Sequence, residues 1–173
     1  GKLNIEKAQY IGLIKTNSAS SIITDSAAGA TAFSTGRKTY NGAIAVDLDK
    51  NPTKTVLEWA QEKGMSTGLV ATSSVTHATP ASFGAHIDYR KKEYDIASQY
   101  ANGDIDVILG GGKKFWSDSL INIYVKNNGQ FIDNIKTPID NNKKILGLFS
   151  DKGLGKANED RSVSTTDMAK IAL

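Results

Sequence analysis

The sequence contains no cysteine and no long apolar run, and each absence excludes a class of structure. Without cysteine, the chain can form neither disulfides nor cysteine-ligated metal sites. No apolar run approaches the ~20 residues that a membrane-spanning helix needs, so we expect no membrane span. The first residues, Gly1-Lys2-Leu3, show no secretory signal and resemble an internal or engineered sequence.

The composition is that of a folded domain with a modest positive charge. Of the 173 residues, 39% are hydrophobic and 23% are charged, and we expect residues 1–173 to form a single domain with its own core. The formal net charge is +3, but the lysines occur as scattered pairs rather than as one stripe interleaved with aromatic residues. We therefore expect no nucleic-acid partner.

Apolar strands alternate with helical patterns along the chain. Continuous apolar stretches predict buried strands at residues 8–14, 21–24, 68–71, 107–109 and 146–149. Capping residues and helical spacing predict helices at residues 27–35, 51–64, from 79 onward, 90–101, 120–127 and 164–173. Residues 38–47 are typical of a hairpin, and residues 130–132 are extended. This alternation predicts an α/β fold, a three-layer α/β/α sandwich with a largely parallel central sheet.

Three polar clusters follow predicted strands. They are Asp25-Ser26, the loop at residues 72–79 and the triple glycine at residues 110–112. In open parallel sheets, ligands bind at the carboxyl ends of the strands. We therefore expect a functional site to draw on these three clusters.

Ser26 lies between a predicted strand and a helix of small residues, and two interpretations fit it. Asp25 or Ser26 can simply be the N-cap of the helix at residues 27–35, with Gly36 after its last turn. Alternatively, Ser26 is a nucleophile on phosphorus, because the N–H groups and the dipole of a helix N-terminus stabilise negative charge. No histidine is adjacent in sequence to act as its base, so a metal ion would be the activator. Gly29 within this helix suggests close approach of another part of the backbone.

The other polar residues at the strand ends also admit structural and functional interpretations. Thr79 precedes Pro80 and can be an N-cap, with the proline at the first helical position. His77 can be solvated or can lie near a metal ion. Arg90 can face solvent or can bind two phosphate oxygens at once. The glycines at residues 110–112 lack the spacing of a P-loop, and we expect a tight structural turn there.

Taken together, these features resemble the alkaline phosphatases. The stretch Thr24-Asp25-Ser26-Ala27-Ala28-Gly29-Ala30-Thr31-Ala32 is similar to the nucleophile signature of that family. The resemblance continues in order through residues 34–36, 38–43, 75–81, 85–86, Arg90, 108–112 and 146–149, and it covers essentially the whole chain.

The resemblance implies hydrolysis of phosphate monoesters through a phosphoserine, with two zinc ions and one magnesium ion in the complete protein. Ser26 would match the nucleophile and a zinc ligand, and Arg90 the arginine that holds two phosphate oxygens. Asp25 would match the aspartate that positions this arginine. Thr79 would match a direct magnesium ligand, and His77 would reach the magnesium through water. The family also implies a periplasmic or extracellular homodimer.

The sequence departs from the family pattern in its metal ligands. The upstream Asp-Gly-x-Gly segment has no counterpart, and neither do the magnesium-binding glutamate and the zinc-binding Asp-x-x-x-His, Asp-His and late histidine. His86 matches no family ligand, and we expect it to be structural. The helical pattern at residues 164–173 is still running where the chain stops. We therefore expect an incomplete fold, a fragment of a longer chain that by itself is inactive because its zinc sites are incomplete.

Two alternatives remain at this point. One is a phosphodiesterase or sulfatase that shares the fold, although Arg90 suits the two free oxygens of a monoester better. The other is a non-catalytic phosphate-binding or scaffold remnant, which an intact set of Asp25, Ser26 and Arg90 disfavours.

Overall fold

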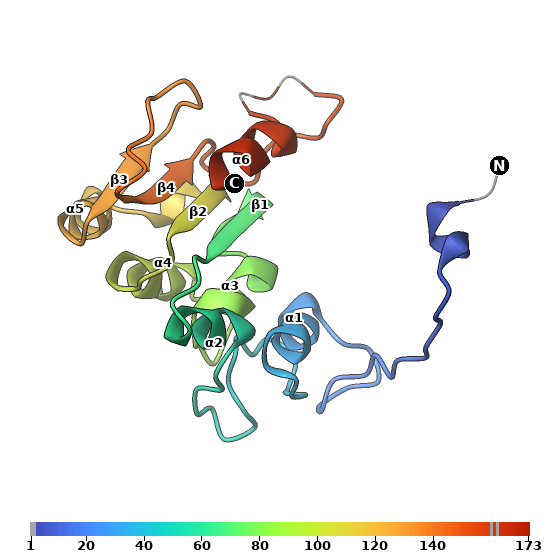
Figure 1. Ribbon diagram of the computed structural model, residues 1–173. Coiled ribbons are helices and arrows are strands. Elements are labelled where there is room, and N and C mark those ends of the chain that lie inside the picture. The colour runs from blue at the N-terminus through green and yellow to red at the C-terminus, as the bar shows by residue number, and fades with distance from the viewer. Residues whose placement is uncertain (1–2, 160, 162) are drawn as a thin grey trace.

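A parallel sheet forms the centre of the computed structural model, which describes residues 3–159, 161 and 163–173 (Figure 1). In this part of the chain the sheet has four strands in the order β1-β2-β4-β3, and every neighbouring pair is parallel. The strands are β1 (Gly68–Ser74), β2 (Val107–Gly111), β3 (Gly129–Ile132) and β4 (Lys144–Leu148). The strands predicted at residues 68–71, 107–109 and 146–149, and the extended segment at 130–132, are therefore confirmed.

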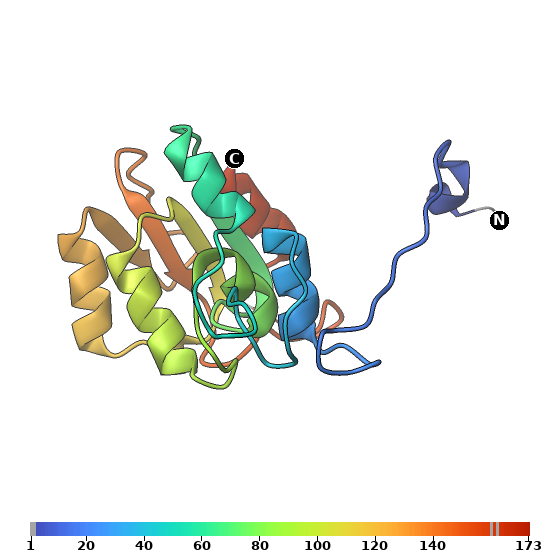
Figure 2. The ribbon, with the colours of Figure 1, turned by 90° about the horizontal axis from the view of Figure 1, so that it is seen from below.

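Helices cover both faces of this sheet, which confirms the predicted three-layer α/β/α arrangement. Alternate residues of the central strands point to opposite faces: Ile108 and Leu146 join one apolar cluster, and Leu109 and Ile145 join the other. Figure 2 shows α4 and α5 on one side of the strands and α6 on the other. The helices are α1 (Ser26–Thr35), α2 (Val56–Glu62), α3 (Ala78–Gly84), α4 (Glu93–Asn102), α5 (Asp118–Lys126) and α6 (Thr165–Ala172), with short 3-10 turns η1 (Asn4–Lys7) and η2 (Lys113–Phe115).

The two strands predicted before α1 are wrong. Apart from η1, residues 3–25 contain neither helix nor strand. Residues 3–13 run away from the body of the molecule as an extended arm (Figure 1), whereas the segment after them hydrogen-bonds to residues 38–41, for example through the Ala19 N–H and the Thr39 carbonyl. Tyr10, Ile11 and Leu13 are at least 91% exposed. A strand is stable only when its backbone pairs with a neighbour, and this arm pairs with no strand in the described part of the chain.

The predicted hairpin at residues 38–47 is also wrong. A turn does form at Asn41-Gly42, where Gly42 has a φ of 93°. However, Ile44 pairs antiparallel with Ile87, which follows α3, and Val46 pairs with Pro52. Because the side chains at 43–46 are all buried, packing against distant segments fixes this stretch instead of pairing across the turn.

Three helices begin at positions other than those predicted. Thr55 caps α2 through its side chain and Glu58 completes a capping box, so the helix starts after residues 51–53. His77 occupies the cap position of α3, which makes Thr79 the second helical residue. Helix α4 starts at Glu93 rather than Arg90, so Arg90 lies in the turn before it.

Candidate active site

Asp25 is the N-cap of α1, and Ser26 is the first residue of that helix. The Asp25 backbone is extended, and its Oδ1 accepts a hydrogen bond from the Ala28 N–H at 2.9 Å. The Asp25 N–H in turn donates to Asn41 Oδ1 at 3.2 Å. Because Asp25 satisfies the cap, the Ser26 hydroxyl is not needed for that purpose and lies at the positive end of the helix.

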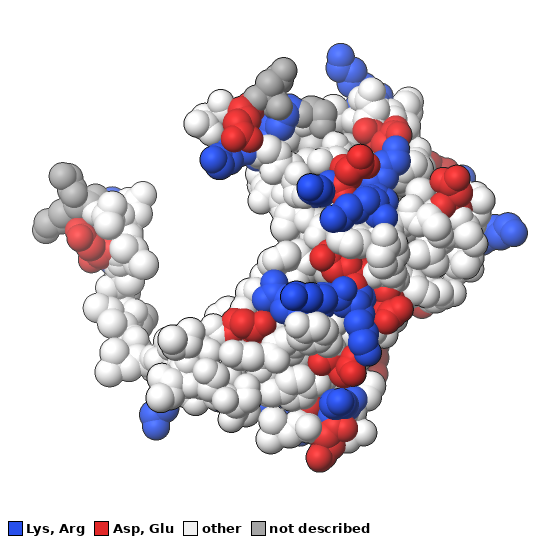
Figure 3. Space-filling model, turned by 180° about the vertical axis from the view of Figure 1, so that it is seen from behind, with Lys and Arg blue, Asp and Glu red and all other residues white. Residues whose placement is uncertain are grey.

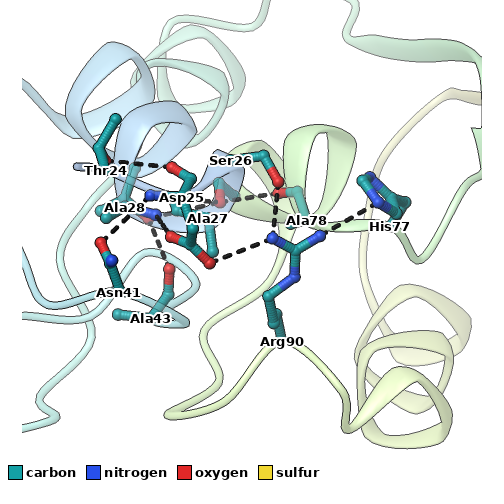
Figure 4. Close-up of polar contacts among 12 residues, drawn as sticks. Thr24, Asp25, Ser26, Ala27, Ala28, Asn41, Ala43, His77, Ala78 and Arg90 are labelled. Atoms are coloured by element: carbon teal, nitrogen blue, oxygen red, sulfur yellow. Dashed lines mark hydrogen bonds and ion pairs between the residues drawn. The ribbon is translucent and has the colours of Figure 1, made fainter. Parts of the chain in front are cut away.

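Arg90 joins Asp25 and Ser26 from a turn 64 residues further along the chain (Figure 4). Its Nη1 donates to Asp25 Oδ2 at 3.1 Å and to Ser26 Oγ at 2.6 Å. The backbone N–H of Arg90 donates to the Gly42 carbonyl at 2.8 Å, which fixes the base of the side chain. The side chains of Arg90 and Asp25 are only 24% and 27% exposed, so their ion pair is partly shielded from water.

His77 completes the cluster on the other side of the guanidinium. Arg90 Nη2 lies 3.1 Å from His77 Nε2. Since a guanidinium nitrogen can only donate, Nε2 accepts and the proton of the neutral imidazole is on Nδ1. Burial lowers the pKa of His77, the positive charge of Arg90 lowers it further, and Glu93 acts in the opposite direction. His77 is therefore neutral at physiological pH.

The carboxyl group of Asp25 stays ionised. Burial acts to raise its pKa, but hydrogen bonds from the Ala28 N–H and the Arg90 side chain outweigh burial and hold the pKa below its usual value. An aspartate that is ionised at neutral pH keeps both the helix cap and the arginine in place.

Thr79 lies beside this cluster rather than in it. It is exposed, and it lines a cavity of about 310 Å³ together with Asp25, Ser26 and Phe33. It also lines a larger cavity of about 710 Å³, shared with His77 and the free edge of β1. The structure thus brings four of the predicted site residues into direct contact and places the fifth on the wall between the two adjoining cavities.

His86 and the triple glycine lie outside the site and have structural contacts. His86 Nδ1 lies 2.7 Å from the Ala45 carbonyl and Nε2 lies 3.0 Å from Glu58 Oε1. Burial acts to raise the pKa of Glu58, but the Thr55 N–H and His86 more than offset this and lower it. Gly112, with a φ of 97°, donates its N–H to the carbonyls at residues 150 and 152, as a tight turn requires.

The sequence did not indicate the residues that hold the site residues in place without belonging to the cluster themselves. Asn41 and Gly42 were recognisable only as a turn, and nothing local indicated that they hold Asp25 and Arg90. Glu93 accepts hydrogen bonds from two hydroxyls that are 17 and 19 residues away in sequence. Such separations leave no local pattern in one sequence, so only the fold reveals these contacts.

The donor atoms of the site limit the metal ions that it can hold. In the part of the chain that the structure describes, no group of three or more His, Cys, Asp or Glu side chains could hold a metal ion. Asp25 and His77 already contact Arg90, and Thr79 offers one hydroxyl oxygen. A zinc site needs about four ligands, and magnesium about six, so the described residues do not fit a zinc site and supply only part of a magnesium site.

The fold and the site together define a class of protein. An α/β sheet protein with a serine hydroxyl at a helix N-terminus, held by an arginine that an aspartate anchors, has a site suited to a phosphoryl group. The chain belongs to the alkaline phosphatase family, whose family model matches residues 1–173.

Individual relatives agree with this membership. Alkaline phosphatase 3 of Bacillus subtilis is 52% identical over 144 residues, which cover 78% of this chain and 31% of that protein. Alkaline phosphatase 4 of the same organism is 44% identical over 163 residues, which cover 87% and 35% of the two chains. This chain therefore spans about a third of the length of these two relatives.

Solved structures show the same fold. The alkaline phosphatase of the Antarctic bacterium TAB5 superimposes with a TM-score of 0.86 at 37% identity, covering 100% of this chain and 54% of that one. A cold-active alkaline phosphatase from the psychrophile Shewanella sp. also gives a TM-score of 0.86 at 38% identity, covering 92% and 41%.

Proposed function

We propose that the full-length protein hydrolyses small phosphate monoesters, with Ser26 as the nucleophile. The observation that carries this proposal is the 2.6 Å contact between Arg90 Nη1 and Ser26 Oγ, in a cluster that Asp25 anchors. An arginine that already touches the nucleophile can also bind the group that the nucleophile attacks.

The reaction has two displacements. Ser26 Oγ bonds to phosphorus while the ester P–O bond breaks, and the leaving alcohol takes up a proton. Water then bonds to the same phosphorus, the Ser26 P–O bond breaks, and inorganic phosphate and the free serine are released. Arg90 would hold two non-bridging oxygens, which requires its Nη1 and Nη2 to exchange Ser26 and His77 for phosphate. Asp25 would keep the guanidinium aligned throughout.

We propose that the complete protein binds two zinc ions and one magnesium ion. The Thr79 hydroxyl would coordinate the magnesium directly, and His77 would bind it through a water molecule. That Ser26 is a zinc ligand stays a prediction. Metal ions of this kind lower the pKa of a bound hydroxyl and neutralise phosphate charge. The described residues lack a zinc ligand set. We therefore propose that the 173-residue chain alone is inactive. Zinc-dependent turnover by this chain that Ser26→Ala abolishes would contradict that.

The proposal is tested with the full-length protein and an aryl phosphate substrate. Ser26→Ala should abolish turnover, and mass spectrometry after an acid quench should find phosphate on Ser26 in the wild type. Ser98→Ala, which removes one hydroxyl from α4 outside the site, should keep wild-type activity. Full activity in Ser26→Ala would refute the proposed nucleophile.

Arg90 distinguishes monoester hydrolysis from diester hydrolysis or sulfate-ester hydrolysis. A guanidinium that binds two free oxygens favours a monoester dianion over a diester. Arg90→Ala should therefore lower kcat/KM for an aryl phosphate far more than for the matching phosphodiester or aryl sulfate. Higher wild-type activity on the diester or the sulfate would instead favour the alternative function.

The remaining assignments concern the setting of the enzyme. We propose an exported homodimer, periplasmic or extracellular, in which residues 1–173 belong to one domain of a longer chain. No helix in the described ranges has the length and apolar character to cross a membrane. Basic and acidic side chains lie next to one another on the face shown in Figure 3. Ion pairs of the described residues include Lys92–Asp88 and Lys113–Asp133. Light scattering on the full-length protein tests the dimer.

A further inference from the structure

A carboxylate behind the candidate site holds the segment that carries His77 and Thr79. Glu93, the first residue of α4, accepts hydrogen bonds on one oxygen, Oε2, from Thr76 Oγ1 at 2.6 Å and from Ser74 Oγ at 2.9 Å. Thr76 is fully buried and Ser74 is 8% exposed. Buried hydroxyls need partners, and a carboxylate can accept from both without offering a competing donor.

These contacts fix the end of β1 where the chain turns toward the site. The His77 N–H donates to the Ser74 carbonyl at 3.0 Å, and the Val75 N–H donates to the Gly111 carbonyl at 2.9 Å. The turn is therefore held by β2 on one side and by Glu93 on the other. His77 follows Thr76 directly, so a shift of the Thr76 hydroxyl moves the imidazole.

Glu93 is also close in sequence to Arg90, which belongs to the other half of the site. Arg90 lies three residues before it, in a turn closed by the hydrogen bond from the Lys92 N–H to the Tyr89 carbonyl at 3.0 Å. One side chain thus joins the turn that carries Arg90 to the turn that carries His77. The two turns meet again at the 3.1 Å contact between Arg90 Nη2 and His77 Nε2.

We propose that Glu93 is a positioning residue that sets the separation of Arg90 from His77 and Thr79. The inference rests on the proposed phosphatase function and adds to it a residue that touches neither the substrate nor Ser26. Without the Glu93 carboxylate, the end of β1 is free to move relative to the Arg90 turn, and the guanidinium loses its fixed orientation toward the phosphate.

The test compares three variants of the full-length protein by steady-state kinetics with an aryl phosphate. Glu93→Ala should lower kcat/KM roughly ten- to hundredfold, because small misplacements of a substrate-binding group have effects of that order. It should also raise the inhibition constant of inorganic phosphate. Glu93→Gln, which keeps an acceptor oxygen of the same reach, should recover most of kcat. Asp95→Asn removes one charge from the same first turn of α4 at an exposed position and should match the wild type.

A purely structural role predicts a different pattern. It would lower the thermal midpoint of Glu93→Ala while kcat and the phosphate inhibition constant of the folded enzyme stayed at wild-type values, and that result would overturn the inference. If Glu93→Ala does not fold, Thr76→Val removes one of the two donors isosterically. It should then raise the phosphate inhibition constant in the same direction, and no change would overturn the inference.

The double variant that combines Thr76→Val with Glu93→Ala tests the hydrogen bond between Thr76 and Glu93. Since Thr76→Val removes the hydroxyl that Glu93 accepts from, the kinetic effects of Thr76→Val and Glu93→Ala should be less than additive, and full additivity would overturn the inference. Ser26→Ala distinguishes failure of the positioning role from failure of the proposed function. If Ser26→Ala is inactive and Glu93→Ala keeps kcat/KM within about twofold, the positioning role alone fails. If Ser26→Ala is active, the proposed function fails, and this inference fails with it.

Discussion

Replacing Asp25 separates its two roles, because alanine and asparagine remove different contacts. Asp25 Oδ1 caps α1 through the Ala28 N–H, and Oδ2 binds Arg90. Alanine removes both contacts. Asparagine keeps a carbonyl oxygen for the cap and is about as good an N-cap as aspartate. Its amide N–H₂ would face the guanidinium, which offers only donors, so the contact with Arg90 is lost in both variants.

The magnitudes follow from these contacts. The cap is worth about 1 kcal/mol. The ion pair adds at most about 1 kcal/mol because both side chains are partly solvated. Asp25→Ala should therefore lower the free energy of unfolding by about 1–2 kcal/mol, and Asp25→Asn by about 1 kcal/mol less than that. Both variants should weaken phosphate binding to a similar degree, about tenfold or roughly 1.4 kcal/mol, because Arg90 loses its anchor in each.

Two assays on the full-length protein check this reasoning. Urea unfolding gives the difference in stability, and inhibition of aryl phosphate turnover by inorganic phosphate gives the difference in affinity. Equal stability of the two variants would refute the cap. Wild-type phosphate affinity in Asp25→Asn would refute the anchoring of Arg90.

Three further substitutions test the surrounding structure by urea unfolding or thermal unfolding. Gly29→Ala should raise the free energy of unfolding by about 0.5–1 kcal/mol, since the nearest atoms to a new Cβ are those of the Thr24 side chain at 3.9 Å; a loss would show that another part of the protein packs there. Gly129→Ala should lower it by about 1–3 kcal/mol, because the Cβ would lie 2.6 Å from the Tyr124 carbonyl and overlap its ring, and unchanged stability would contradict this packing. Glu58→Gln should be less stable than the wild type at pH 7. Because the folded-state pKa of Glu58 is lowered, that difference should be fully present above the ordinary glutamate value of about 4.3 and should shrink as the pH falls through the lowered folded-state pKa; a difference that did not shrink at all in acid would count against it.

Local signals in the sequence predicted the parts of the fold that depend on neighbouring residues. Helix α6, with its capping box from Ser164 to Asp167, and helix α1, with Asp25 before it and Gly36 in the left-handed region after it, lie where their caps predicted. Strands β2 and β4 are buried on both faces and so appear as continuous apolar runs.

The same apolar criterion failed where pairing with a distant segment decides the structure. Residues 8–14 are as apolar as a buried strand, yet their large side chains are exposed. Ile44 pairs with Ile87 rather than across the nearby turn. Gly29 suggested a close backbone approach, but the part of the chain that the structure describes leaves space beside it.

The sequence by itself predicted the candidate site residues, because the stretch around Asp25-Ser26 resembles the nucleophile signature of the family to which the chain belongs. It also determined that these residues come near helix and strand ends. Only the tertiary structure decided which atoms are in contact. Asp25 rather than Ser26 caps α1. Arg90 lies in a turn and contacts Ser26 with one nitrogen and His77 with another, and Glu93 holds the end of β1. These contacts join segments up to 65 residues apart, and their geometry depends on how helices pack on a sheet rather than on any local pattern.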